Sequence, residues 1–114
     1  MTAASGDPDE RTALERMLEA RSVAVVGASV KEGSLGRQMM LELLRGGFDG
    51  AIYPVNPGYD DVLGHRCYPS IADVPGSVDL AILGVANHRV EQALRDAVGA
   101  GARSAVTFSS LYEA

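Results

Sequence analysis

The part of this sequence best suited to bind a ligand is a small glycine turn, Gly27-Ala28-Ser29. A short apolar run, Val23 to Val26, precedes the turn, and apolar residues at helical spacing follow it from Leu35 to about Leu44. In a strand, glycine turn and helix of this kind, the first helical turn leaves backbone N–H groups unpaired and carries the positive end of the helix dipole. An anion completes the hydrogen bonding there. The sequence therefore predicts an anion site at this turn.

Length and composition restrict the class of protein. A chain of 114 residues with 46% hydrophobic and 22% charged residues is typical of one ordinary globular domain. The net charge of -5 argues against a nucleic-acid partner. The single cysteine, Cys67, excludes an internal disulfide framework and is expected in the core of a protein from a reducing compartment. No apolar run approaches the roughly 20 residues of a membrane span, so we expect a cytoplasmic protein with no membrane partner.

The elements that must position the turn alternate between strand and helix. Strands are expected over residues 23–26, 51–55, 66–68, 78–85 and 104–108. Two of these runs are apolar throughout, which is typical of a parallel sheet covered on both faces. The pattern predicts an α/β, Rossmann-like, doubly wound parallel sheet of about five strands with helices on both faces. Its ligand cleft should lie at the carboxyl ends of the strands.

Two further helices are predicted. One begins at Asp7 and packs on the domain, after a disordered start over residues 1–6. The other follows the central strand and is capped by Asn87. Its buried face is expected to consist of Val90, Ala93, Leu94, Ala97 and Val98. Residues 7–114 are thus expected to form a single domain, which we expect to be part of a longer multidomain chain.

The identity of the anion depends on the glycine spacing and on the end of the second strand. The GxGxxG fingerprint of nicotinamide dinucleotide sites is not met, because Ala28-Ser29 follows Gly27. Those proteins also place an acidic residue at the end of the second strand, where this chain has Val55-Asn56-Pro57. A neutral amide can still bind an adenosine but gives up the charge-assisted contact.

An ordered set of motifs, VAVVGAS, GSLGR, YPVNP, CYPSIADVP and VDLAILGV, resembles the CoA-binding domain of the NDP-forming acyl-CoA synthetases. These enzymes are relatives of the succinyl-CoA synthetase α subunit, and the domain also occurs joined to protein acetyltransferases. The similarity extends from Arg21 to Glu113. It implies a module that binds CoA or acyl-CoA, is not catalytic alone, and works with further synthetase domains in the same or a partner chain.

The resemblance also implies a set of binding residues. Those around the CoA phosphates would be Gly27, Ala28 and Ser29, with Lys31, Ser34 and Gly36 on the same loop and helix start. Asn56 and Pro57 would lie by the adenosine, and Val85 and Ala86 along the floor of the cleft.

The chain departs from the related sequences at three positions. Gly58 stands where they often carry a lysine that could pair with the 3′-phosphate, and Ala86 stands where they often have proline. The turn around Leu111 lacks their usual glycine.

No catalytic residue and no metal site are predicted. The resemblance places the phosphorylated histidine of the full-length enzymes in a separate domain, and neither His65 nor His88 lies in a matching motif. His88 stays open as a ligand contact at the mouth of the cleft. Asp60 and Asp61 have no further ligands at a suitable spacing.

The proposed binding residues also have structural interpretations. Gly27 and Gly36 allow a strand and a helix to pack closely. Ser29 and Ser34 can cap the helix. Asn56 can form an Asx turn before the proline that follows it. Two other functions therefore stay open: an NAD(P)-binding oxidoreductase or redox-sensing domain, and a regulatory or interaction module that has lost ligand affinity.

Overall fold

The computed structural model of this protein describes residues 20–107. The predicted disordered start, the helix from Asp7 and the turn around Leu111 lie outside these residues. Within the described range, no helix has the length and apolar character needed to cross a bilayer.

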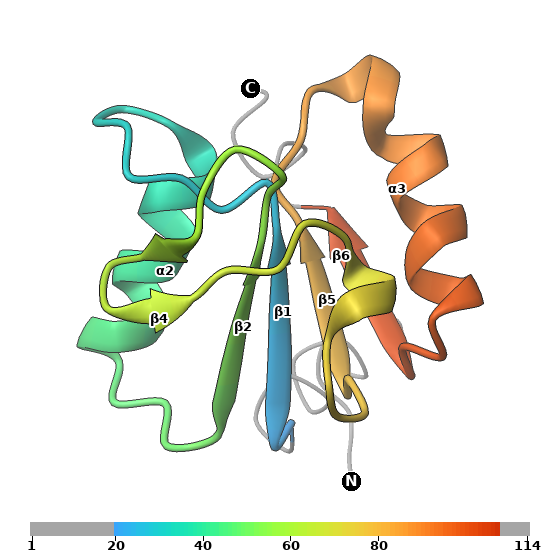
Figure 1. Cartoon of the computed structure of the whole chain (residues 1–114), viewed down its shortest axis with the longest axis horizontal. Coiled ribbons are helices and arrows are strands. Elements are labelled where there is room, and N and C mark those ends of the chain that lie inside the picture. Colours follow the sequence, from blue (N-terminus) through green and yellow to red (C-terminus); the bar gives the residue numbers. More distant parts are fainter. Residues whose placement is uncertain (1–19, 108–114) are drawn as a thin grey trace, which may run out of the picture.

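Within the described chain, a parallel sheet of four strands lies between two helices (Figure 1). The strands are β1 (Ser22–Val26), β2 (Ala51–Val55), β5 (Leu80–Leu83) and β6 (Ser104–Thr107), in the spatial order β2-β1-β5-β6. Helix α2 (Leu35–Arg45) connects β1 to β2 on one side of the sheet, and α3 (Asn87–Gly99) connects β5 to β6 on the other. The predicted Rossmann-like, doubly wound α/β fold is confirmed.

The predicted strand over residues 66–68 is not a fifth member of this sheet. Instead β4 (His65–Arg66) pairs antiparallel with β3 (Asp61–Val62). The turn that joins them, Leu63-Gly64, has positive φ angles of 50° and 88°, as a tight hairpin requires. Only Tyr68 reaches the sheet, where its N–H donates to the carbonyl of Pro54 in β2 and its carbonyl accepts from the N–H of Asn56, directly after β2. The pairing stops there because the following residue is a proline, which has no N–H.

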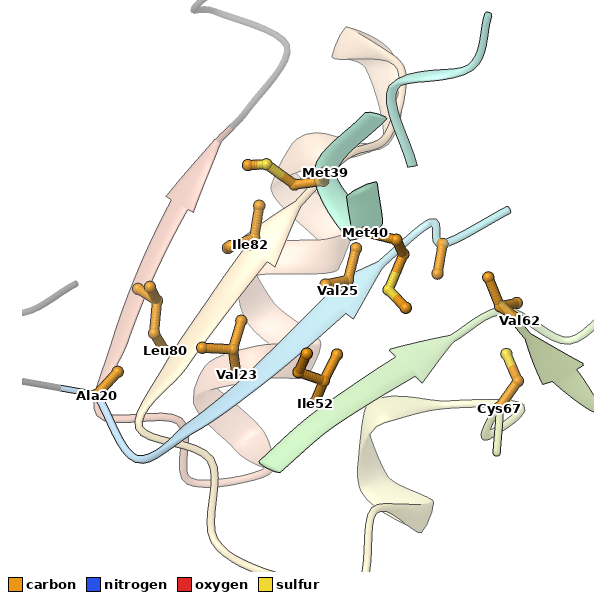
Figure 2. Close-up of a cluster of buried hydrophobic side chains, with 11 residues drawn as sticks. Ala20, Val23, Val25, Met39, Met40, Ile52, Val62, Cys67, Leu80 and Ile82 are labelled. Atoms are coloured by element: carbon orange, nitrogen blue, oxygen red, sulfur yellow. The ribbon is translucent and has the colours of Figure 1, made fainter. Parts of the chain in front are cut away.

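Alternating side chains of the strands form two cores. Val23 and Val25 of β1 face α2, while Ala24 faces α3. Figure 2 shows the core on the α2 side, where Met39 and Met40 pack over the strands. The α3 side includes the 3-10 turn η1 (Ile71–Asp73), whose Ile71 is buried against that helix. The sheet is therefore covered on both faces, as its apolar strands require.

Helix α3 differs from the prediction at its start and on its buried face. Ala86 occupies the cap position, and Asn87 is the first helical residue, so the predicted Asn87 cap is wrong. Ala93 and Ala97 are buried, but Leu94 is 42% exposed and Val98 is 64% exposed. The small side chains of Ala93 and Ala97 let the helix approach the sheet. Leu94 and Val98 each lie one residue further on, so they are rotated by about 100° around the helix axis, toward solvent. Val90 is half-buried.

Candidate functional site

Glycines from three elements meet where β1, α2 and β5 converge. Gly27, directly after β1, has a φ of 91°, and a Cβ there would lie 2.5 Å from the carbonyl oxygen of Gly84. A Cβ on Gly36, in the first turn of α2, would overlap the carbonyl oxygen of Gly27. The packing interpretation of Gly27 and Gly36 is thus confirmed. Gly84 was not predicted as part of this site, although it directly follows a buried strand, as Gly27 does.

The turn after Gly27 presents backbone donors. Ala28 and Ser29 are buried, and within residues 20–107 no hydrogen bond engages their backbone N–H groups or that of Val30. The Ser29 hydroxyl accepts from the N–H of Lys31 at 2.9 Å and lies 3.1 Å from the hydroxyl of Tyr59. The geometry therefore leaves N–H groups at this turn that a ligand anion can accept from.

Ser34 and the residues near it fix the start of α2. The Ser34 hydroxyl accepts from the N–H of Arg37 at 3.2 Å and donates to the carbonyl of Lys31 at 2.8 Å, so its predicted capping role is confirmed. The Lys31 side chain is exposed on the same turn. Arg37 is half-buried, and its Nε atom is buried without a hydrogen-bond partner in the described structure. A positive charge accordingly lies on each side of Ser34 in the sequence.

Asn56 fastens the glycine turn to the end of β2. Its Nδ2 donates to the carbonyl of Ala28 at 2.9 Å, and its Oδ1 accepts from the N–H of Gly58 at 2.8 Å. The second bond is the predicted Asx turn. Because both ends of the amide are bonded within the protein, the side chain positions the turn in this structure.

A cleft of about 440 Å³ opens at the carboxyl ends of β1 and β2, beside α3 and η1. Of the predicted binding residues, Gly27, Asn56, Pro57 and Val85 line it, whereas Ala28, Ser29, Lys31, Ser34, Gly36 and Ala86 do not. Its other lining residues are Val26, Val55, Pro69, Ser70, Ile71, His88, Arg89, Gln92, Ala93 and Asp96. The structure thus brings the turn and the cleft together at Gly27.

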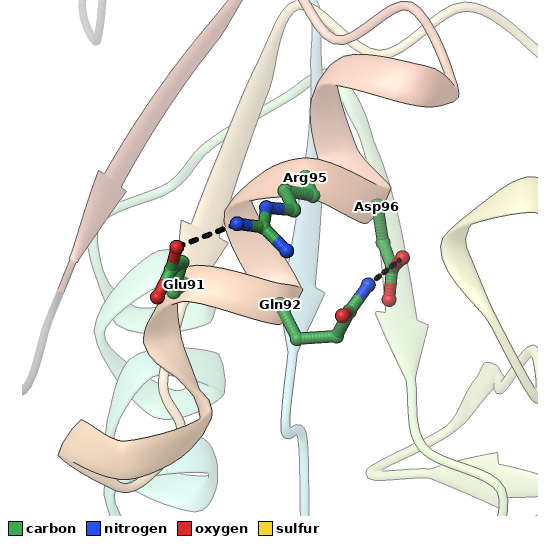
Figure 3. A network of polar contacts seen from close by, with 4 residues as sticks. All are labelled: Glu91, Gln92, Arg95 and Asp96. Carbon is green, nitrogen blue, oxygen red and sulfur yellow. Dashed lines mark hydrogen bonds and ion pairs between the residues drawn. The ribbon is translucent and has the colours of Figure 1, made fainter.

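The polar side of α3 in this cleft is the part that the sequence analysis missed. Its signal was present, since Arg89, Gln92 and Asp96 recur every three to four residues on the helix that follows a buried strand. Figure 3 shows the Gln92 amide donating to the Asp96 carboxylate, at 2.9 Å. His88, left open from the sequence, does line the cleft.

Cys67 is buried and free. Burial raises the pKa of its thiol, and the neighbouring carboxylates of Asp60 and Asp61 act in the same direction against the lowering effect of backbone hydrogen bonds. A thiol held in its neutral form is a weak nucleophile, which agrees with the predicted core role. Among the described residues no group of three or more His, Cys, Asp or Glu side chains could hold a metal ion.

The sequence from residue 21 to residue 114 matches a protein family whose model is described as a CoA binding domain. The chain belongs to this CoA-binding family. It is 43% identical over 90 residues to an ADP-forming acetate–CoA ligase II of Archaeoglobus fulgidus, a match that covers 79% of this chain and 13% of the ligase. It is 36% identical over 97 residues to a trans-feruloyl-CoA synthase of an unknown prokaryote, with 85% of this chain and 14% of the synthase covered.

A solved structure shares the fold of this CoA-binding domain. The dinucleotide-forming acetyl-coenzyme A synthetase 1 of Candidatus Korarchaeum cryptofilum, in complex with phosphate and ADP, superposes with a TM-score of 0.76 and 40% identity, covering 81% of this chain and 20% of that chain. Of the ligase of Archaeoglobus fulgidus, the chain spans only about an eighth of the length (13%). These relatives confirm the family expected from the sequence and give no support to an NAD(P)-dependent oxidoreductase or to a module without ligand.

Proposed function

We propose that this chain is the CoA-binding module of an ADP-forming acyl-CoA synthetase, or of an acetyltransferase fused to such a domain, and that it is not catalytic alone. The curated relatives support this assignment, because their names differ in the acid and agree in CoA: one is an acetate–CoA ligase and another a trans-feruloyl-CoA synthase. A segment that enzymes for different acids have in common is better suited to bind CoA, the substrate that they share, than the acid that differs between them.

The observation that carries the proposal is the set of unpaired backbone N–H groups at Ala28 and Ser29. CoA suits this turn, because its diphosphate offers acceptor oxygens and negative charge where the protein offers donors. The exposed Lys31 and the unpartnered Nε of Arg37 add positive charge beside the turn. The diphosphate would therefore lie against residues 27–34, with the backbone of the turn as its main contact.

The rest of CoA would occupy the cleft that begins at Gly27. Its volume of about 440 Å³ falls within the usual range for small-molecule sites. Asn56 and Pro57 line the cleft on the β2 side and would lie by the adenosine, with Asn56 acting through the turn that it fastens. Val85 belongs to the apolar floor. Catalysis would belong to the further domains that make the relatives several times longer than this chain.

Isothermal titration with CoA, ADP and NAD at one salt concentration tests the proposal. We expect CoA to bind most tightly and ADP weakly, because ADP has the diphosphate but lacks the pantetheine arm and the 3′-phosphate. We expect no binding of NAD, because the chain lacks the acidic residue that binds its ribose at the end of the second strand. No heat with CoA, supported by no rise in the thermal midpoint, would contradict the proposal. A response to NAD alone would support the nicotinamide alternative instead.

A charge reversal locates the diphosphate. Lys31→Glu changes an exposed side chain on the turn, so the fold should be retained while CoA affinity falls about tenfold. Arg103→Glu is the matched control, since it makes the same charge change at an exposed residue just before the edge strand β6, at the amino end of a strand and not at the carboxyl end where the turn lies. Equal affinities of the two variants would show that the phosphates do not bind at this turn.

A further inference from the structure

The two sides of the cleft differ in charge. The strand side is formed by Val26, Val55, Asn56 and Pro57, which carry none, and the adjoining Gly58 has no side chain to add. The α3 side includes the imidazole of His88, the guanidinium of Arg89 and the carboxylate of Asp96. Among the residues that line the cleft, Arg89 is therefore the permanent cation.

Arg89 is not used by the rest of the described structure. Its backbone N–H donates to the carbonyl of Ala86 at 2.8 Å, but no hydrogen bond or ion pair within residues 20–107 engages its guanidinium. The carboxylate in the cleft already accepts from Gln92. Arg95, six residues further along the same helix, behaves differently, because it pairs with Glu91 at 2.7 Å on the exposed surface (Figure 3).

The position of Arg89 in the same cleft as the glycine turn offers a binding place for a second anionic group of the ligand. Gly27 and Arg89 line the same cleft. Gly27 lies at the end of β1, and Arg89 lies in the first turn of α3, the helix that follows β5. A ligand with one anionic group at the turn can thus present another to the guanidinium. The planar guanidinium binds phosphate through two parallel N–H donors.

We propose that Arg89 binds the 3′-phosphate of CoA and makes this domain select nucleotides that carry a 3′-phosphate. This inference rests on the proposed function, which places the diphosphate at the turn. The 3′-phosphate is the remaining anionic group of CoA, since the pantetheine arm carries no charge. Apolar residues that line the same cleft, among them Val26 and Ile71, offer a surface for the adenine ring.

Titrations of the 114-residue chain with CoA and with 3′-dephospho-CoA test this role. The parent should bind CoA about tenfold or more tightly than dephospho-CoA. Arg89→Gln should lower CoA affinity by the same factor, leave dephospho-CoA affinity unchanged and so remove the preference. Arg95→Gln, on the same helix but outside the cleft, should keep the preference of the parent. A preference retained by Arg89→Gln would overturn the inference.

A second pair of ligands distinguishes a failure of the Arg89 assignment from a failure of the proposed CoA binding. Adenosine 3′,5′-bisphosphate carries the 3′-phosphate without a diphosphate, and adenosine 5′-monophosphate lacks both. The parent should prefer the bisphosphate and Arg89→Gln should not. If CoA binds and this preference is absent, the Arg89 role is wrong while the CoA module stands. If the chain binds neither CoA nor the bisphosphate, both assignments fail.

Discussion

Asn56 shows how one side chain can fix the glycine turn to the end of a neighbouring strand. Its two hydrogen bonds join the carbonyl of Ala28 to the segment that leaves β2. Asn56→Asp keeps the acceptor for Gly58 and replaces the donor to Ala28 with a carboxylate oxygen. We expect the free energy of unfolding to fall by about 1–3 kcal/mol, because two acceptors then face each other, and CoA affinity to fall with it. Urea denaturation and calorimetry measure the two effects.

The control for Asn56→Asp is Gln38→Glu, the same change of amide to carboxylate on the exposed surface of α2. Its amide is only 3.5 Å from Glu42, so the new repulsion should cost no more than about 0.5 kcal/mol. If Asn56→Asp were as mild as this control, the bond to Ala28 would not position the turn.

At the level of elements, α2 packs closely against the end of β1 at Gly36. Gly36→Ala would place a methyl group on the carbonyl of Gly27, which is backbone and cannot move aside as a side chain can. We expect a loss of at least about 1–3 kcal/mol in the free energy of unfolding and a displaced turn. Thermal and urea unfolding of the variant measure the loss.

Gly99→Ala provides the comparison for Gly36→Ala. Gly99 is also a helical glycine, but a Cβ there meets nothing within 4 Å. The substitution should stabilise the protein by up to about 1 kcal/mol, because alanine loses less backbone freedom in a helix. Similar effects of the two variants would mean that α2 can shift away from the turn.

Elements with one strong pattern could be predicted from the sequence, and those with competing patterns could not. The apolar runs of β1 and β2 and the helical spacing of α2 each predict one element, and all three elements were confirmed, although Leu44 near the end of α2 is 39% exposed. In α3, two overlapping stripes were available, and close approach to the sheet selects the one with Ala93 and Ala97. Arg89 escaped prediction because its place in the cleft depends on segments distant in the sequence, which line the other side of that cleft.

For the whole molecule, the buried thiol of Cys67 gives a pH dependence of stability. Burial raises the pKa of this thiol in the folded state, so the folded protein keeps a proton that the unfolded chain releases. The free energy of unfolding should be insensitive to this group below about pH 8.5 and should fall as the pH rises beyond that value. Urea midpoints between pH 7.5 and pH 10 test this expectation.

Cys67→Ala isolates the contribution of the thiol from the other groups that titrate at alkaline pH. The variant should be less stable than the parent at neutral pH, since it loses a buried sulfur, but its midpoint should decline less with rising pH. Parallel curves for the two proteins would show that Cys67 does not cause the decline.

The central place of β1 in the sheet also affects the order in which the molecule can assemble. Both neighbours of β1 come later in the chain, at residues 51–55 and 80–83, and the N–H of Gly84 bonds to the carbonyl of Val26. During synthesis, the glycine turn is therefore made early but reaches its final shape only after β5 has emerged from the ribosome. Such distant pairings favour slow folding. A ligand held by this turn should slow unfolding of the finished protein and leave the rate of folding almost unchanged.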